Sequence, residues 1–201
     1  MEARTQRSEL TRTAIVGAAL DLAAAEGLEA ISLQVVADRV GLSKSGVFSR
    51  VGSREALQKA VIEEYGRRFL ADVFVPAMQQ PKGLPRLNEV VSRWLTRVRD
   101  VESQRACIFA AGAFEFDDRE GPVRDFLQGE VTRWRAALRR SVLQAMEAGH
   151  LKPDTDPDQL AGEICGLVIG AMHDCRFLRD LRACDRAAAT WQRLLSTYQP
   201  R

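Results

Sequence analysis

Positions 44–50 carry side chains that bind phosphates and the edges of nucleic-acid bases. Lys44 and Arg50 offer cations to phosphate or guanine, and Ser45 and Ser49 offer hydroxyl groups to phosphates or base edges. Gly46 lies between them and has no side chain, so the backbone there can approach a bound molecule closely. Residues of these types would contact DNA if one short helix presented them together.

The surrounding residues predict such a helix as the second half of a helix-turn-helix over 33–51. Gly41 stands at the corner, where the backbone most easily takes a left-handed conformation, and Ser43 is placed to cap the second helix. The apolar residues spaced to form one small core between the two helices are Val36, Val40, Leu42 and Val47. In a helix-turn-helix the second helix lies in the major groove of DNA, which predicts duplex DNA as a partner.

The predicted DNA contacts extend beyond this second helix. The net charge of +2 is too small to indicate a nucleic-acid-binding protein by itself, so a basic surface must be local. Arg4, Arg7 and Arg12 gather near the N-terminus and would add to it. Phe48 is expected to lie partly in the core, with some reach toward the groove. The full set of predicted DNA contacts is Arg12, Thr13, Ser32, Gln34, Ser43, Lys44, Ser45, Gly46, Phe48, Ser49, Arg50 and Arg54.

The composition is that of an ordinary globular chain. Of its 201 residues, 46% are hydrophobic and 28% are charged, which argues against disordered and fibrous classes. No apolar run reaches the roughly 18 residues of a membrane-spanning helix, and the N-terminus does not resemble a signal peptide. We therefore expect a cytoplasmic protein.

The sequence lacks the residue groupings of a catalytic or metal site. There is no recognisable Ser/His/Asp arrangement, no Gly-rich phosphate loop and no metal-ligand cluster, so we expect no enzyme activity, no cofactor and no metal. The cysteines form no CxxC pair, and in a cytoplasmic protein we expect free thiols at Cys107, Cys165, Cys175 and Cys184.

Helical periodicity runs along the whole chain and predicts an all-α fold. The expected helices span approximately 8–26, 33–40, 43–51, 54–73, 86–101, 107–116, 122–148, 157–180 and 185–198. Ser32 and Ser53 are placed to cap the helices on either side of the turn motif, and Asp185 is placed to cap the last helix. We expect a helix-turn-helix head over 1–53 and a larger helical body over 54–201.

The head resembles the tetracycline-repressor (TetR) family of bacterial transcription regulators. The resemblance runs from Ala18 through VVADRVGLSKSGVFSRVGSREALQKAV, which ends at Val61. The body resembles one branch of that family more loosely, through residues 83–87, 107–109 and 115–119. The resemblance implies an all-helical homodimer with paired DNA heads and a body that binds a small-molecule inducer.

This chain departs from the usual family pattern in the second helix. Phe48 keeps an aromatic residue, but Arg50 and Val51 replace the His or Tyr and the Phe that commonly follow. Val51 still supplies a smaller apolar plug, and Arg50 adds a charge where a phosphate contact is plausible. Ser45-Gly46 inverts the commoner order of the two residue types, so the preferred DNA sequence is expected to differ.

The resemblance implies that the body, over 54–201, is a ligand-binding and dimerisation domain with an apolar pocket. The candidate ligand contacts are Trp94, Cys107, Phe109, Phe114, Trp134, Met172, His173 and Phe177. The candidate interface residues, from the last two helices, are Leu160, Ile164, Leu167, Val168, Ala171, Trp191, Leu194 and Leu195. His173 is either a ligand anchor or a core histidine, and Glu115 is more consistent with a solvated or capping role than with a ligand contact.

These features predict a repressor that a small apolar or amphipathic ligand releases from a pseudo-palindromic operator. The alternative is a regulator that senses thiol oxidation through a cysteine such as Cys107.

Overall fold

The computed structural model describes residues 2–200, with the side chains of all of these except residues 2–5 and 7. Every regular element in this described part is helical, which confirms the predicted fold class. The side chains of Arg4 and Arg7, which we predicted to add to the basic surface, are not among those described. The chain divides into two compact units: a head unit of residues 1–67 and 106–131, and a body unit of residues 68–105 and 132–201.

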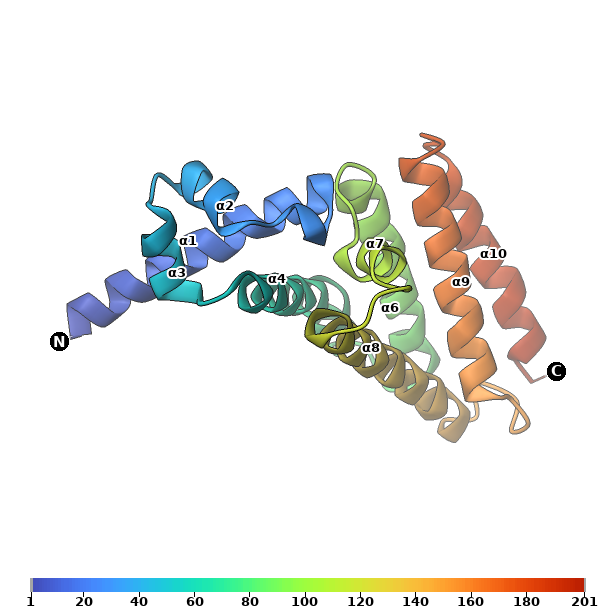
Figure 1. Cartoon of the computed structure of the whole chain (residues 1–201). Helices are drawn as coiled ribbons and strands as arrows, with labels where there is room; N and C mark the ends of the chain where they lie inside the picture. Colours follow the sequence, from blue (N-terminus) through green and yellow to red (C-terminus); the bar gives the residue numbers. More distant parts are fainter. Residues whose placement is uncertain (1, 201) are drawn as a thin grey trace. The chain divides into compact units, whose positions relative to one another are not determined.

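The head unit contains the predicted helix-turn-helix and the segments that pack with it. Its elements are α1 (Glu2–Glu26), η1 (Leu28–Ala30), α2 (Leu33–Val40), α3 (Lys44–Val51), most of α4 (Arg54–Phe69), α7 (Ile108–Glu115) and the beginning of α8 (Pro122–Glu147). Figure 1 shows α2 and α3 joined by the tight turn beside α1. The predicted division after residue 53 does not coincide with the unit limits, because α7 and much of α4 belong to the head unit.

Local signals fix the ends of the helices in the helix-turn-helix as predicted. The Ser32 hydroxyl accepts the Val35 N–H at 3.1 Å, and the Ser43 hydroxyl accepts the Gly46 N–H at 3.1 Å. Gly41 takes the left-handed conformation at φ 67°. Ser53 caps α4 by accepting the Ala56 N–H at 3.1 Å. The helical backbone of α1 begins at Glu2, earlier than the predicted start near residue 8.

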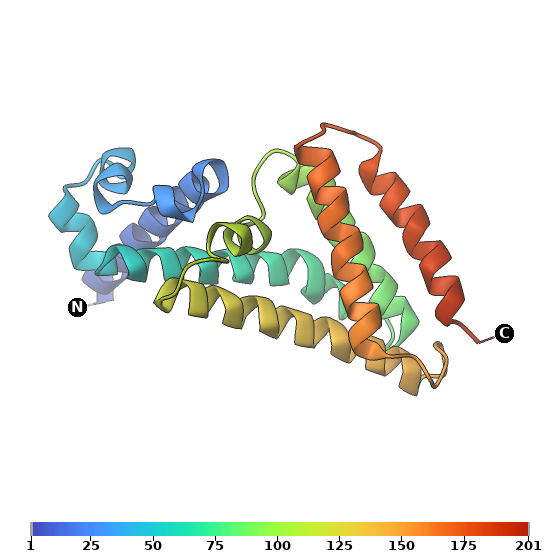
Figure 2. The same ribbon diagram turned by 45° about the vertical axis from the view of Figure 1, so that its right-hand side comes forward.

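The body unit is built around α6, α9 and α10. Its elements are the end of α4, η2 (Leu70–Phe74), α5 (Val75–Ala77), α6 (Leu84–Arg97), η3 (Val98–Glu102), the rest of α8, α9 (Pro157–Arg176) and α10 (Ala183–Tyr198). Figures 1 and 2 show α9 and α10 running side by side. No helix in the described part of the chain has the length and hydrophobicity needed to cross a membrane.

The end of α9 and the start of α10 differ from the prediction. Helix α9 ends at Arg176 rather than near residue 180, and α10 begins at Ala183, so Asp185 lies in its first turn and is not its cap. The carboxylate of Asp180 accepts the Arg182 N–H at 2.9 Å. This local side-chain bond competes with continued helix and stabilises a turn between the two helices.

Both η2 and η3 are π-helical turns, and one arginine connects them. Arg97, at the end of α6, forms ion pairs with Asp72 in η2 and with Glu102 in η3, the latter at 3.0 Å. The side chains of Arg97 and Glu102 are only 7% and 1% exposed. This pair therefore lies in the body core, where a charge is costly unless an opposite charge accompanies it.

Candidate functional site

The face of α3 away from the core carries the predicted cations and hydroxyl groups. Val47 is buried in the core of the head unit, whereas the exposed residues of the helix are Lys44, Ser45, Phe48, Ser49 and Arg50. Phe48 is 57% exposed, so it is only partly covered by the core and its ring reaches the outer face of α3, as expected. Because Phe48 follows Lys44 by four positions, the aromatic ring and the ammonium group lie on the same side of α3.

Hydrogen bonds within α3 hold several of these side chains. The Ser49 hydroxyl donates to the Gly46 carbonyl at 2.9 Å, and the Arg50 guanidinium donates to the Ser49 hydroxyl at 3.1 Å. The hydroxyl groups of Ser43 and Ser45 lie 3.1 Å apart. The polar groups on this face are thus held close to one another by hydrogen bonds.

The remaining predicted DNA contacts have more varied surroundings. Arg12 is exposed, as are Thr13, which donates to the Glu9 carbonyl at 3.0 Å, and Gln34, which donates to Asp38 at 2.7 Å. Arg54 instead donates to the backbone carbonyls of Ile31 at 2.7 Å and Glu29 at 2.6 Å. Arg54 therefore has an internal structural role in the head unit.

Sequence reasoning missed how the Glu29 side chain joins this part of the head. Burial alone would raise the pKa of Glu29, but the hydrogen bond from Arg119 and the charge of Arg54 lower it overall. Arg119 lies 2.9 Å from Glu29, and Arg54 lies 3.3 Å from it. Arg119 belongs to residues 115–119, a segment noted in the sequence for its family resemblance, but the sequence does not indicate that it contacts Glu29.

Two of the predicted ligand contacts lie in an aromatic cluster of the body unit. The ring centroids of Trp94 and Trp134 are 4.7 Å apart in an edge-to-face arrangement, and both rings also pack edge-to-face on Phe69. Within the described residues, the buried indole N–H of Trp94 has no hydrogen-bond acceptor. A buried donor without an acceptor calls for an explanation, and a bound polar group would provide one.

Of the other predicted ligand contacts, some belong to the head unit and some to the body unit. Cys107, Phe109 and Phe114 belong to the head unit, where Phe114 is exposed and Cys107 accepts a hydrogen bond from the Tyr65 hydroxyl at 3.0 Å. In the body unit Met172 is buried. The body residues His173 and Phe177 are exposed, so the interpretation of His173 as a core histidine does not hold.

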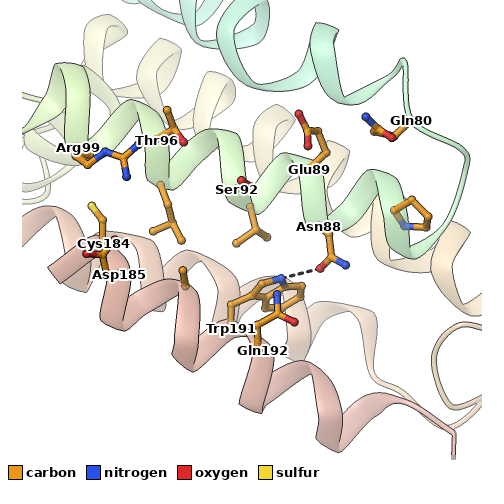
Figure 3. A pocket seen from close by; sticks show the side chains of 14 residues that line it. Gln80, Asn88, Glu89, Ser92, Thr96, Arg99, Cys184, Asp185, Trp191 and Gln192 are labelled. Atoms are coloured by element: carbon orange, nitrogen blue, oxygen red, sulfur yellow. Dashed lines mark hydrogen bonds between the residues drawn. The ribbon is translucent and has the colours of Figure 1, made fainter. Parts of the chain in front are cut away.

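The body unit contains a cleft between α6 and α10 that the sequence did not reveal (Figure 3). Its volume is about 450 Å³, within the range of small-molecule sites. Val91, Leu95 and Ala188 provide apolar lining, and Trp191 donates its indole N–H to Asn88 at 2.8 Å. The other residues of the lining are Gln80, Pro85, Glu89, Ser92, Thr96, Arg99, Cys184, Asp185 and Gln192. None of the predicted ligand contacts is among the lining residues.

Most of the residues predicted to form the dimer interface are buried inside the chain itself. The buried members of that set are Leu160, Ile164, Val168, Ala171, Trp191 and Leu195. Leu167 and Leu194 are half-buried. On α9 the side that remains exposed carries Gly162, Gly166 and Gly170, and space is open around each of them.

The helix-turn-helix, its exposed cationic helix and the helical body define a DNA-binding regulator. The family model of the tetracyclin repressor-like C-terminal domain matches residues 83–191, more than half of the chain. The chain therefore belongs to the TetR family of transcriptional regulators, as its head predicted.

Solved structures of other regulators share the fold at low sequence identity. A TetR-family regulator from Cytophaga hutchinsonii is 19% identical, covers 97% of this chain and 98% of its own, and has a TM-score of 0.82. One from Chloroflexus aurantiacus is 22% identical, covers 96% of both chains, and has a TM-score of 0.79. AibR, in complex with isovaleryl coenzyme A and operator DNA, is 20% identical over 94% of this chain and 98% of its own, with a TM-score of 0.69. No curated protein matches the sequence.

Proposed function

We propose that this regulator is a repressor whose α3 binds the major groove of a pseudo-palindromic operator. The observation that carries the proposal is the capped α2–turn–α3 unit with Lys44, Ser45, Ser49 and Arg50 exposed on one short helix. Cations position a protein on the phosphate backbone, while hydroxyl and guanidinium groups also read base edges. The exposed ring of Phe48 is suited to contact a thymine methyl group.

A homodimer would place one α3 on each half of such an operator. The glycine row of α9, at Gly162, Gly166 and Gly170, supports the proposal because a partner helix can approach closely along it. The half-buried Leu167 and the exposed Ile169 flank this row and would supply apolar contact. We therefore propose this exposed side of α9, in place of the buried residues first predicted, as the interface.

Release from DNA would follow from a small amphipathic molecule bound in the cleft between α6 and α10. The apolar residues of the cleft suit a hydrocarbon portion, and its amides and hydroxyl groups suit a polar end. AibR, a regulator of the same fold, is described in complex with isovaleryl coenzyme A and operator DNA, which supports the binding of a small molecule as well as DNA but says nothing of release. An effector acts only if it binds the form with low DNA affinity more tightly than the operator-binding form.

Gel-shift assays test the proposal. We expect fragments enriched from a random pool, and DNA upstream of the protein's own gene, to bind about a thousandfold more tightly than unrelated DNA at physiological salt. Molecules that raise the melting temperature are then added, and at least one is expected to weaken the complex. Binding that depends on salt but is blind to sequence would contradict the proposal.

The thiol-sensing alternative has a specific structural obstacle. Burial raises the pKa of Cys165, and burial together with the neighbouring Cys175 raises the pKa of Cys184 to about 12. Thiols with raised pKa values carry little reactive thiolate near neutral pH. Cys107 is also buried. The sulfur atoms of Cys175 and Cys184 lie 3.3 Å apart.

We predict that the cysteines of the native protein react slowly with a thiol reagent at pH 8. Unfolding in guanidinium chloride should expose them and make the reaction rapid, which provides the internal control. The measurement is the absorbance released by a chromogenic disulfide over time. A fast native phase that disappears in a Cys107→Ser variant would favour the thiol-sensing alternative.

A further inference from the structure

A carboxylate from α7 caps the turn that joins α1 to α2. Glu115 accepts the Leu28 N–H at 2.9 Å with one oxygen and the Glu29 N–H at 2.7 Å with the other. Hydrogen bonds from backbone N–H groups to a carboxylate are short and charge-assisted. Gly27 leaves room for this contact, because it has φ +94° and a Cβ there would lie 2.9 Å from a Glu115 oxygen.

Other polar side chains hold the same turn. Arg119 forms its ion pair with Glu29 at 2.9 Å. From α4, Gln58 donates to the Leu28 carbonyl at 2.9 Å, and Arg54 donates to the Glu29 carbonyl at 2.6 Å. The N–H groups of Leu28 and Glu29 are thus bound by α7, and the carbonyl groups of the same two residues are bound by α4.

The position of this turn matters for the DNA-contacting helices. Ile31 follows η1, and Ser32 then caps α2, so the turn sets where the helix-turn-helix begins. The other side of the contact, α7, continues the chain that arrives from η3 of the body unit through residues 103–107. Within that connection the Ala106 N–H donates to the Ala24 carbonyl of α1 at 2.9 Å.

We propose that Glu115 and Arg119 form a latch that positions the helix-turn-helix for operator binding. This proposal adds positioning residues to the proposed operator binding, and it rests on that proposed function. Both residues act through η1 and so are positioning residues. Their loss lowers the population of the arrangement that fits the operator, and it weakens sequence-specific binding more than general attraction to DNA.

The first test is Glu115→Gln, which keeps the shape of the side chain but removes its charge and one acceptor oxygen. We expect about tenfold weaker binding to selected operator DNA, as for loss of a hydrogen bond to a charged group. Affinity for unrelated DNA at low salt should stay within about twofold, because the cationic surface is unchanged. Amide hydrogen exchange at Leu28 and Glu29 should become faster. The matched control, Glu120→Gln, alters an exposed carboxylate of the same segment and should behave like the wild type.

A second variant keeps the proposal falsifiable if Glu115→Gln folds poorly. Arg119→Gln removes a half-exposed ion pair and the contact of the guanidinium with the Phe116 ring, so the protein should fold while specific binding falls by about threefold. Unchanged specific affinity in the folded variants would overturn the latch, and so would an equal loss of specific and non-specific binding. A wild-type protein that shows no preference for any DNA sequence would instead refute the proposed function, a result seen before any variant is made.

Discussion

Replacing Arg97 with methionine is expected to lower the free energy of unfolding by about 3–5 kcal/mol. The guanidinium of Arg97 lies 3.0 Å from the Glu102 carboxylate, and both side chains are almost fully buried. Methionine fills much of the same volume but takes away a cation that compensates a buried negative charge. The buried Glu102 carboxylate then loses the guanidinium that accompanies it, and removing one partner of a buried ion pair is costly. Guanidinium chloride unfolding followed by circular dichroism measures the difference.

Two further variants separate the buried charge from the loss of packing. Arg93→Met removes an arginine from the same helix whose ion pair with Glu89 is half-exposed, and it should cost less than about 1 kcal/mol. The double variant Arg97→Met/Glu102→Leu removes both buried charges, and it should be more stable than Arg97→Met alone. A double variant less stable than Arg97→Met would show that the cost of Arg97→Met does not come from the charge left on Glu102.

The head could be predicted in detail because its signals are local. Ser32 and Ser43 each bond an N–H three positions along the chain, and Gly41 alone supplies the left-handed corner. Such interactions depend only on nearby residues, so their spacing in the sequence is sufficient. The contact of Glu115 with Glu29 spans 86 positions, and no periodicity connects residues so far apart.

The body was predicted less well because periodicity identifies a face of a helix but not its neighbour. Leu160 and Ile164 lie on the apolar face of α9, and this face packs inside the chain instead of remaining available to a second copy. The small size of the glycines on the exposed face already indicates that a helix can approach closely, but glycines show no apolar periodicity, so the predicted contacts followed the apolar residues instead. The cleft between α6 and α10 depends on residues such as Asn88 and Trp191, which are 103 positions apart. Only the packing of these helices reveals that they share a cavity.

Replacing both Lys44 and Arg50 with alanine is expected to weaken operator binding about a hundredfold while leaving the melting temperature and the oligomeric state unchanged. Each side chain is exposed on α3, so its removal leaves the core of the head unit intact. A good contact from a basic side chain to DNA is worth about 1–3 kcal/mol, and the effects of two such substitutions multiply in the binding constant. Fluorescence anisotropy with selected operator DNA measures the change, and analytical ultracentrifugation measures the oligomeric state.

The salt dependence of binding distinguishes the roles of the two cations. For each phosphate that the variant no longer neutralises, the slope of log affinity against log salt should fall by about 0.9, whereas removing a side chain that reads a base relaxes the preference at one operator position. The control variant Lys82→Ala/Arg193→Ala removes the same net charge from exposed positions of the body unit. It should bind the operator nearly as well as the wild type, because screening at physiological salt confines each charge to its own neighbourhood. Equally weakened binding in the two double variants would mean that net charge, rather than the surface of α3, holds the DNA.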